Sequence, residues 1–504
     1  MPTNSPSERR LGRALLAGGA VAFAVVATLN AGGYRYGASD QAFYIPAILH
    51  QLDPALYPRD WPMIGAQGRY FLLDELLAGV IRATGLSLPA LFLAAQAATL
   101  IALFAGAVGL GRAVLVSPWA MTAWLAALTL RHRIAGTGAN TLEGYFHPRV
   151  LVCGLGLVSL ALLLRGRPWW ALALAVMSGA LHPTTAACFV AIIGIAIVVT
   201  TPTARRPLAA AAAAAAALVM LRTWQGHTVF DVTVMDPGWR ALVATKDYTF
   251  PTTWPAETWL FNLAGPAILV GAAVARRRAG LLAPAERGLL AGALLLVAGF
   301  FASLPFIAAG VALAVQLQTS RVFWPVELVA TLYAVWWLAD APAARQRRPW
   351  TAAALAAVLV VAAVTRGVYV GVVEHPERPT LAIDLLTDEW TRALAWVADH
   401  TRPDAYVLAD PGHAWKFGTA VRIGARRDVY LEEVKDVAMA MYSRDAATRV
   451  GARIEAVAGF DGLDEAALAA LAARDGLTVL VTARQLGLPV MHAEGAVRVY
   501  RLGP

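Results

Sequence analysis

Apolar stretches alternate with polar segments over the first three quarters of the chain. A helix needs about 20 mostly apolar residues to cross a membrane, and stretches of this kind, some of them shorter, recur eleven times. They cover residues 14–31, 88–110, 117–130, 150–164, 169–181, 184–199, 208–221, 258–274, 288–304, 322–338 and 352–370. The pattern predicts a mainly α-helical, polytopic membrane bundle of about eleven spans.

Arginine-rich sequences flank these stretches on one side of the alternation, among them RRLGR, RGRP, TARRP and ARQRRP. Because basic loops stay in the cytoplasm, we expect a cytoplasmic N-terminus, with residues 14–31 as a retained anchor rather than a cleaved signal. An odd number of spans then places the C-terminus outside. The expected location is the inner membrane of a bacterium.

The polar segments on the opposite side are longer. The first covers residues 32–87, and within it residues 71–84 form an amphipathic pattern that predicts a helix along the membrane surface. Residues 374–504 contain no long apolar stretch and alternate short strands with helices, which predicts a small extracytoplasmic α/β domain after a membrane domain of residues 1–373. The expected strands are 405–409, 429–431, 478–482 and 497–500, and the expected helices are 388–400 and 464–474.

Composition supports a membrane protein. Of the 504 residues, 58% are hydrophobic and 15% charged, and the mean hydropathy is +0.58. Soluble proteins carry about a quarter charged residues. The net charge of +9 comes mostly from arginines beside the apolar stretches, so it requires no nucleic-acid partner. Cys153 and Cys188 lie inside apolar stretches, as core residues rather than disulfide or metal ligands.

Asp40 is the leading catalytic candidate of the first polar segment, where it follows the first apolar stretch in the sequence SDQ. Two interpretations are equally good from the sequence. Asp is a preferred helix N-cap, and a carboxylate close to the membrane surface can take a proton from a hydroxyl group. Gln41, Arg59 and Asp60 belong to the same segment, and we expect them to contact a substrate.

The sequence TLEGYFHPR brings Glu143, His147 and Arg149 to the same predicted side. Each residue alone is more often structural. A carboxylate, an imidazole and a guanidinium group at one membrane edge favour a polar site. Glu143 is therefore the second catalytic candidate, and His147 and Arg149 are candidates for substrate binding.

Two weaker signals lie on that side. His182 precedes a proline in HPTT, where a histidine usually caps or packs against a helix and less often contacts a phosphate. Gln318 and Arg321 lie in QLQTSR, at the start of an apolar stretch. There the arginine either extends toward the interface or binds an anionic ligand.

Motifs of several other enzyme classes are missing from the sequence. It contains no Asp-x-Asp pair, HExxH, Walker loop, Cys–His metal spacing or GxSxG. Each of these would supply a site for a metal, a nucleotide or acyl transfer.

Several sequences resemble segments of the GT-C superfamily of integral-membrane glycosyltransferases and of a bacterial membrane-protein family allied to it. They are SDQAFYIPAIL, DPALYPRD, GYFHPR, HPTT and QTSRVFW. The order of a first span, a large outer loop with an early Asp, many further spans and an outer domain is also similar. The resemblance implies transfer of a sugar from a polyprenyl-phosphate carrier to a lipid, glycan or protein acceptor on the outer face. By position, it gives Asp40 the role of base or acceptor-orienting residue, and Arg149, His182 and Arg321 contact with the lipid phosphate.

The implied reaction inverts the anomeric carbon by direct displacement and uses no cofactor beyond the lipid-linked donor. Lack of a paired acidic motif favours a metal-independent mechanism, with a divalent metal as the alternative. Two other functions stay open. A transporter or flippase for a polar lipid or glycan would place the polar residues near the middle of the membrane, and an assembly factor would keep the fold without catalysis.

Overall fold

The computed structural model describes residues 6–68, 71–224, 233–347 and 350–503. Residues 69–70 of the predicted first loop lie outside the described residues. Each of the eleven apolar stretches forms a helix. These helices are α1 (Pro6–Asn30), α5 (Leu88–Val114), α6 (Pro118–Thr129), α7 (Pro148–Leu164), α8 (Pro168–Ser178), α9 (Pro183–Thr200), α10 (Arg205–Trp224), α12 (Ala256–Arg278), α13 (Pro284–Ala308), α15 (Phe323–Val335) and α17 (Thr351–Tyr369).

Within the described residues, six helical segments are long and apolar enough to cross a membrane by length and composition. They are Leu88–Val114, Pro183–Thr200, Ala256–Arg278, Pro284–Ala308, Ala312–Gln346 and Thr351–Glu374. The segment Ala312–Gln346 includes α14 (Ala312–Gln316), α15 and α16 (Pro342–Arg347). The chain is thus a membrane protein built mainly from helices.

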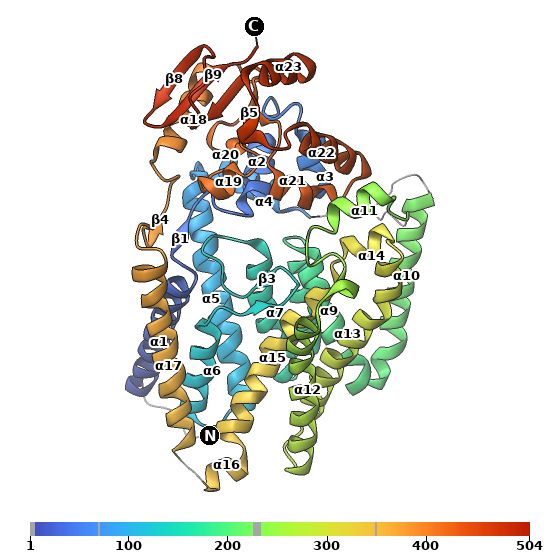
Figure 1. The fold of residues 1–504 in the computed structure, drawn as a ribbon. Coiled ribbons are helices and arrows are strands. Elements are labelled where there is room, and N and C mark those ends of the chain that lie inside the picture. The colour runs from blue at the N-terminus through green and yellow to red at the C-terminus, as the bar shows by residue number, and fades with distance from the viewer. Residues whose placement is uncertain (1–5, 69–70, 225–232, 348–349, 504) are drawn as a thin grey trace.

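The helices stand side by side in a bundle (Figure 1). One close contact joins α5 to α7, where glycines let the two backbones approach closely. A Cβ atom at Gly154 would lie 2.9 Å from the backbone nitrogen of Leu103, and one at Gly106 would lie 2.5 Å from the Cβ atom of Leu157. Small residues at such crossings allow close packing where the hydrophobic effect between helices is weak.

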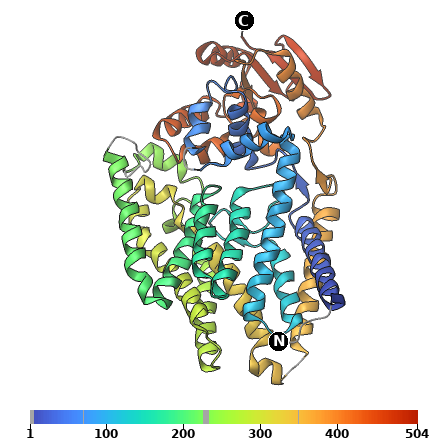
Figure 2. The ribbon, with the colours of Figure 1, turned by 180° about the vertical axis from the view of Figure 1, so that it is seen from behind.

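A cap covers one end of the bundle, and it combines the first loop with the C-terminal residues (Figures 1 and 2). The loop contributes α2 (Gln41–Leu52), α3 (Trp61–Gly68) and α4 (Leu73–Thr84). Strand β1 (Tyr34–Arg35) pairs in parallel with β4 (Leu381–Ala382), which joins the two parts of the cap. Short helix α11 (Pro237–Val243) packs against the same cap.

The C-terminal part of the cap is an α/β unit. Its sheet has the order β6-β5-β7-β9-β8, in which β5 is parallel to β6 and β7 while β9 is antiparallel to β7 and β8. The strands are β5 (Tyr406–Ala409), β6 (Asp428–Val429), β7 (Val479–Thr482), β8 (Val490–Glu494) and β9 (Val497–Arg501). The helices are α18 (Glu389–His400), α19 (His413–Lys416), α20 (Val421–Gly424), α21 (Glu433–Ala440), α22 (Arg444–Ala456) and α23 (Glu465–Asp475).

Four of these strands and the helices α18 and α23 were expected from the sequence, whereas β8 was not. The unit also shares its core with the rest of the chain. One cluster of buried side chains joins Leu408 and Leu480 of the sheet to Met63 of the first loop and to Trp239 and Val315 near the bundle. The cap is therefore packed onto the bundle through apolar side chains.

A buried group of charges fixes the first loop in the cap. Asp60 is fully buried, and its Oδ2 accepts hydrogen bonds from Arg422 Nε at 2.8 Å and from the backbone nitrogen of Val429 at 3.0 Å. Its Oδ1 accepts one from Arg449 Nη2 at 2.6 Å. Arg422 in turn donates to Asp436 Oδ1 at 2.6 Å. Burial opposes the charge of Asp60, yet these arginines outweigh it and lower the Asp60 pKa.

We expect Asp60→Asn to destabilise the protein by about 3 kcal/mol, because removing one member of a buried charge group leaves its partners uncompensated. Thermal or denaturant unfolding in detergent measures the change. The control is Asp404→Asn, which removes a solvent-exposed ion pair with Arg402 and should change stability by less than about 0.5 kcal/mol. Equal effects of the two substitutions would contradict the role of Asp60.

Candidate functional site

A polar cavity of about 420 Å³ lies where the cap meets the bundle. Its walls come from the start of α2, the segment between α6 and α7, the beginnings of α7 and α9, and α21 of the cap. The polar lining residues are Ser39, Asp40, Tyr44, Arg131, Arg133, Asn140, Glu143, Tyr145, His147, Arg149, His182, Thr184, Lys246, Tyr248, Gln318, Arg321, Lys435 and Tyr442. The cavity thus brings together residues that are far apart in sequence.

Asp40 lies at the N-cap position of α2, but its side chain makes no capping hydrogen bond. Instead, Oδ1 accepts a hydrogen bond from Lys435 Nζ at 2.6 Å. Its Oδ2 lies 3.2 Å from His147 Nε2 and 3.8 Å from an Arg149 nitrogen. The Asp40 side chain remains 23% exposed and lines the cavity, so the carboxylate can accept further hydrogen bonds from a ligand.

The hydrogen bonds of His147 determine which ring nitrogen carries the proton. His147 is the N-cap of α7, and its Nδ1 accepts a hydrogen bond from the backbone nitrogen of Arg149 at 3.2 Å. The proton of the neutral ring is therefore on Nε2, which donates it to Asp40. Burial lowers the pKa of His147 to about 3, so the ring is neutral at physiological pH.

Positive groups also determine the charge of Asp40. Burial alone would raise its pKa, but Lys435, His147 and Arg149 together hold the pKa of that carboxyl well below its usual range. Asp40 is thus a carboxylate at any physiological pH.

Arg149 joins Asp40 to Glu143. Its Nη2 donates to Glu143 Oε1 at 2.7 Å, and Asn140 donates to the same oxygen at 3.1 Å. Glu143 and Arg149 are both buried. The Nε of Arg149 is buried without a hydrogen-bond partner among the described residues, so a donor in the cavity wall is left for a ligand.

His182 caps α9 as His147 caps α7. In both places a proline follows the histidine at the first helical position, where its missing N–H and fixed φ angle are favourable. The His182 Nδ1 accepts from the backbone nitrogen of Thr185 at 3.4 Å. Burial, followed by the charges of Arg321, His147 and Arg149, lowers the pKa of His182 well below its usual value. The neutral caps leave the positive ends of two helix dipoles at the cavity, and such ends favour anions.

Gln318 and Arg321 line the cavity from the short segment directly before α15. Gln318 donates to the hydroxyl group of Tyr442 at 3.1 Å. Arg321 lies 5.7 Å from the ring centre of Tyr248, and its buried Nε has no hydrogen-bond partner in the described part of the chain. No carboxylate among the described residues forms an ion pair with Arg321, so its charge is available to an anionic ligand.

Backbone strain is also found at the cavity. Ser39 and Gln318 have φ angles of 50° and 48°, in the left-handed region that non-glycine residues rarely adopt. Both residues line the cavity, on walls from different parts of the chain. Strain of this kind persists where the surrounding structure enforces it, and it is commonly found at functional sites.

Three of the predicted substrate residues lie outside this cavity. Gln41 is buried, accepting a hydrogen bond from the backbone nitrogen of Gly37 and donating one to the Phe146 carbonyl. Asp60 belongs to the buried charge group of the cap, and Arg59 lies over the ring of Tyr406 at 4.8 Å. Gln41 lies on the face of α2 that is buried in the protein. Asp60 is held by Arg422 and Arg449, which are far from it in sequence.

Sequence reasoning missed the contribution of the cap to the cavity. Lys435 on α21 holds Asp40, and Trp415 lies beside it. A signal was present, because the chain contains only three lysines, and two of them, Lys246 and Lys435, line the cavity. In a chain whose cations are otherwise arginines, a lysine is itself unusual.

The cavity as a whole is strongly basic. Its lining contains six arginine and lysine side chains and two carboxylates. Both histidines are neutral, as described above. The described residues contain no group of three or more His, Cys, Asp or Glu side chains arranged to hold a metal ion. The arrangement is therefore suited to an anion held by protein cations and helix N-termini.

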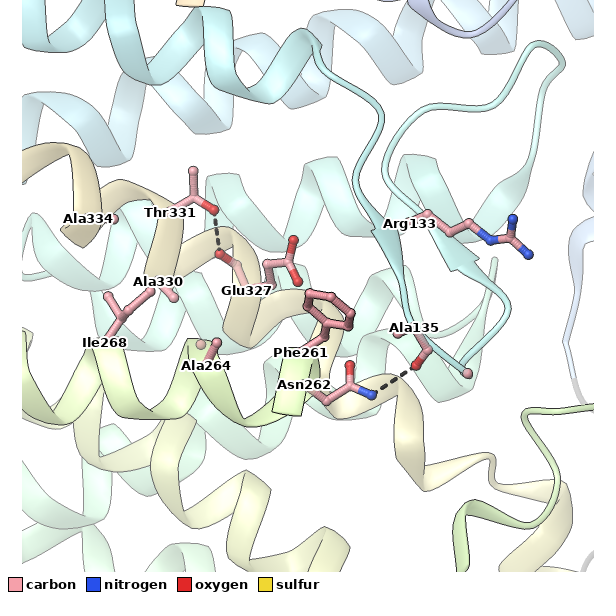
Figure 3. Close-up of a pocket in the computed structure, with 12 residues that line it drawn as sticks. Arg133, Ala135, Phe261, Asn262, Ala264, Ile268, Glu327, Ala330, Thr331 and Ala334 are labelled. Atoms are coloured by element: carbon pink, nitrogen blue, oxygen red, sulfur yellow. Dashed lines mark hydrogen bonds between the residues drawn. The ribbon is translucent and has the colours of Figure 1, made fainter. Parts of the chain in front are cut away.

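A second, more apolar groove of about 710 Å³ lies beside this cavity, between α12 and α15 (Figure 3). Phe261, Ala264 and Ile268 line it from α12, and Ala330 and Ala334 line it from α15. The guanidinium group of Arg133 extends away from the two helices (Figure 3), and Arg133 lines both the groove and the polar cavity. The two spaces are thus adjacent.

No protein-family model matches the chain, and no curated protein matches it. The solved structures that are similar to the chain include the following two. The archaeal oligosaccharyltransferase AglB from Archaeoglobus fulgidus, in complex with an inhibitory peptide and a dolichol-phosphate, is 12% identical, with a TM-score of 0.46, covering 94% of this chain and 70% of that chain. The Archaeoglobus fulgidus oligosaccharyltransferase in complex with zinc and sulfate is also 12% identical, with a TM-score of 0.42, covering 92% of this chain and 67% of that chain. At these identities and TM-scores, the likeness to both structures is distant.

The depressed pKa of Asp40 predicts a definite pH dependence of stability. The folded protein stabilises the ionised form of Asp40, so Asp40 contributes to the free energy of unfolding. This contribution is present in full above the unfolded-state pKa of about 4, and it is lost as the pH falls through the folded-state pKa. The difference in Tm between wild type and Asp40→Asn should stay constant from about pH 8 to pH 5 and narrow below about pH 4. Thermal unfolding in detergent measures it. Asp53→Asn, at an exposed residue of the same loop, is the control and should change Tm little. A Tm difference between wild type and Asp40→Asn that widens in acid would contradict the charge assigned to Asp40.

Proposed function

We propose that the protein is a membrane glycosyltransferase that moves a sugar from a polyprenyl-phosphate carrier to an acceptor hydroxyl or amide. The observation that carries this proposal is the basic cavity at the end of the bundle, in which one partly exposed carboxylate, Asp40, is surrounded by cations. A donor with a phosphate leaving group requires cations, and an acceptor requires a carboxylate to orient it.

The phosphate of the donor would bind to the arginines of the cavity. Arg321 has no carboxylate partner among the described residues, and the Nε atoms of Arg321 and Arg149 are unpaired there. The N-termini of α7 and α9 add their dipoles. Guanidinium groups match the geometry of phosphate oxygens, and their charge would stabilise the phosphate as the bond to the sugar breaks.

The groove between α12 and α15 would hold the carrier's hydrocarbon chain. Apolar side chains line most of it, and the two helices that form it have the composition of membrane spans. Arg133 lines both spaces, so a lipid in the groove would have its phosphate end near the basic cavity. Glu327 also lines the groove, and its Oε1 lies 3.1 Å from His132 Nδ1.

Asp40 would orient the acceptor and take its proton late. A carboxylate with so low a pKa is a weak base toward a free hydroxyl. As the acceptor oxygen bonds to the anomeric carbon and the carbon–oxygen bond to phosphate breaks, the attacking oxygen becomes far more acidic. Its proton can then pass to Asp40 while the electron pair of the broken bond leaves with the phosphate. Direct displacement of this kind inverts the anomeric carbon. Glu143, held by Arg149, would keep that arginine in place.

The location of the polar residues favours this function over transport. A transporter collects its polar side chains near the middle of the bundle. Here these side chains line the cavity beneath the cap, and the cap covers one end of the bundle (Figure 1). Aromatic side chains such as Tyr145, Tyr248 and Trp415 also line the cavity and would pack against sugar rings. An assembly factor with the same fold would bind the donor without turnover. The turnover assay described below distinguishes such a factor from an enzyme.

Asp40→Asn should lower turnover by roughly a hundredfold or more while the protein stays folded. Arg321→Ala should instead raise the KM for the donor, because it removes a phosphate contact. The assay uses purified protein, labelled polyprenyl-phosphate sugars and a membrane extract as the source of acceptor.

Asp53→Asn is the matched control, an Asp→Asn change in the same loop at an exposed residue outside the cavity, and it should keep normal turnover. Donor binding without turnover by the wild type would identify an assembly factor. Near-normal turnover of Asp40→Asn would contradict the role of Asp40 and make Glu143 the next candidate.

The proposal includes a topology, with the cap outside the inner membrane and the N-terminus in the cytoplasm. A phosphatase reporter fused to the C-terminus should be active, and the same reporter after Arg347 should be inactive, because α16 lies at the end of the bundle away from the cap (Figure 1). Reporter activity after Arg347 alone would reverse the orientation and place the cavity in the cytoplasm.

A further inference from the structure

A second basic pocket lies on the solvent-facing part of the cap and is separate from the cavity beneath it. Its volume is about 550 Å³, and it shares no lining residue with the cavity that contains Asp40. Four arginines line it, Arg59, Arg449, Arg453 and Arg474, together with a single carboxylate, Asp475.

Two tyrosines form the base of this pocket and hold the arginines in place. Arg59 and Arg453 lie 4.8 Å and 5.5 Å from the ring centre of Tyr406. Arg453 also lies 5.0 Å from the ring centre of Tyr430 and donates a hydrogen bond to the Tyr430 carbonyl at 2.7 Å. Guanidinium groups that stack on aromatic rings lose little freedom when they bind a ligand, because their planes are already oriented.

The positive charge of the pocket exceeds its negative charge. Arg474 is paired with Asp475 at 2.8 Å, whereas no carboxylate among the described residues forms an ion pair with Arg59. Arg449 and Arg453 lie 2.6 Å and 3.9 Å from Asp60, but that carboxylate already holds Arg422.

Two buried polar atoms of the pocket, the Tyr406 hydroxyl and the Arg449 Nε, are incompletely paired. Tyr406 interacts with the Arg449 side chain, but neither atom has a well-formed hydrogen bond within the described part of the chain. Tyr406 is only 2% exposed. A buried donor without a partner is costly unless a ligand or water supplies one.

We propose that this pocket binds a phosphate group, either free or as part of a phosphate-containing polymer. A phosphate matches the fork geometry of several guanidinium groups at once and supplies acceptors for the Tyr406 hydroxyl and the Arg449 Nε. A single carboxylate would use fewer of these donors. The inference does not depend on the transfer reaction, because the pocket and the cavity have no residue in common.

The test is calorimetric titration of the purified full-length protein with inorganic phosphate and, separately, with a short glycerol-phosphate oligomer, at constant ionic strength. We expect saturable binding with a Kd of about 1 mM for inorganic phosphate. The double variant Arg59→Gln/Arg453→Gln should weaken it at least tenfold, since two charged contacts are removed. Tighter binding of the oligomer identifies a polymer as the ligand, and equal or weaker binding identifies free phosphate.

Controls separate this pocket from the cavity. Arg402→Gln changes an exposed arginine of the same domain, outside the pocket, and should leave phosphate binding unchanged. Arg321→Ala removes a cation of the cavity, so the phosphate binding that remains in this variant belongs to the pocket. If the double variant proves unstable, Arg474→Gln provides a second test, because this side chain is 60% exposed. It should lower the affinity for phosphate by a smaller factor. Unchanged binding in these pocket variants, loss of all phosphate binding in Arg321→Ala, or no saturable binding by the wild type would overturn the proposal. None of these outcomes alters the turnover expected of Asp40→Asn.

Discussion

The arrangement of the cavity depends on one buried carboxylate, Asp60, and the arginines around it. Asp60 belongs to the first loop, while Arg422 and Arg449 belong to the C-terminal part of the cap, so their ion pairs bind two distant segments into one body. Arg422 continues the contact to Asp436, the neighbour in sequence of Lys435. Placing the first loop against α21 in this way brings Lys435 to Asp40, although the two residues are separated by most of the chain.

Electrostatic compensation accounts for the character of the cavity itself. Asp40 keeps its charge despite burial because Lys435, His147 and Arg149 oppose the desolvation cost. The histidines contribute through neutral rings, as hydrogen-bond donor or helix cap, and leave the positive charge to arginine and lysine. The result is a site with an excess of cations, in which one partly exposed carboxylate keeps its charge.

Much of the fold followed from local patterns in the sequence. The eleven apolar stretches all form helices, since hydropathy over a window of one span is a local property. The alternation of spans also placed Asp40, Glu143, His147, Arg149, His182, Gln318 and Arg321 on one side, and the structure brings these seven together. Contacts between distant segments were beyond this reasoning. Lys435 could not be linked to Asp40, and Gln41, Arg59 and Asp60 were grouped with Asp40 only because they are near it in sequence.

The scarcity of lysine gives the protein an unusual chemical property. Only Lys246, Lys416 and Lys435 occur in the whole chain, and Lys416 forms a salt bridge with Asp410 at a half-exposed position of the cap. An amine-selective reagent therefore meets very few targets on this molecule, and two of the three lie in the wall of the cavity. Mass spectrometry of the acylated peptides can therefore follow the cavity through Lys246 and Lys435, with the half-exposed Lys416 as an internal reference.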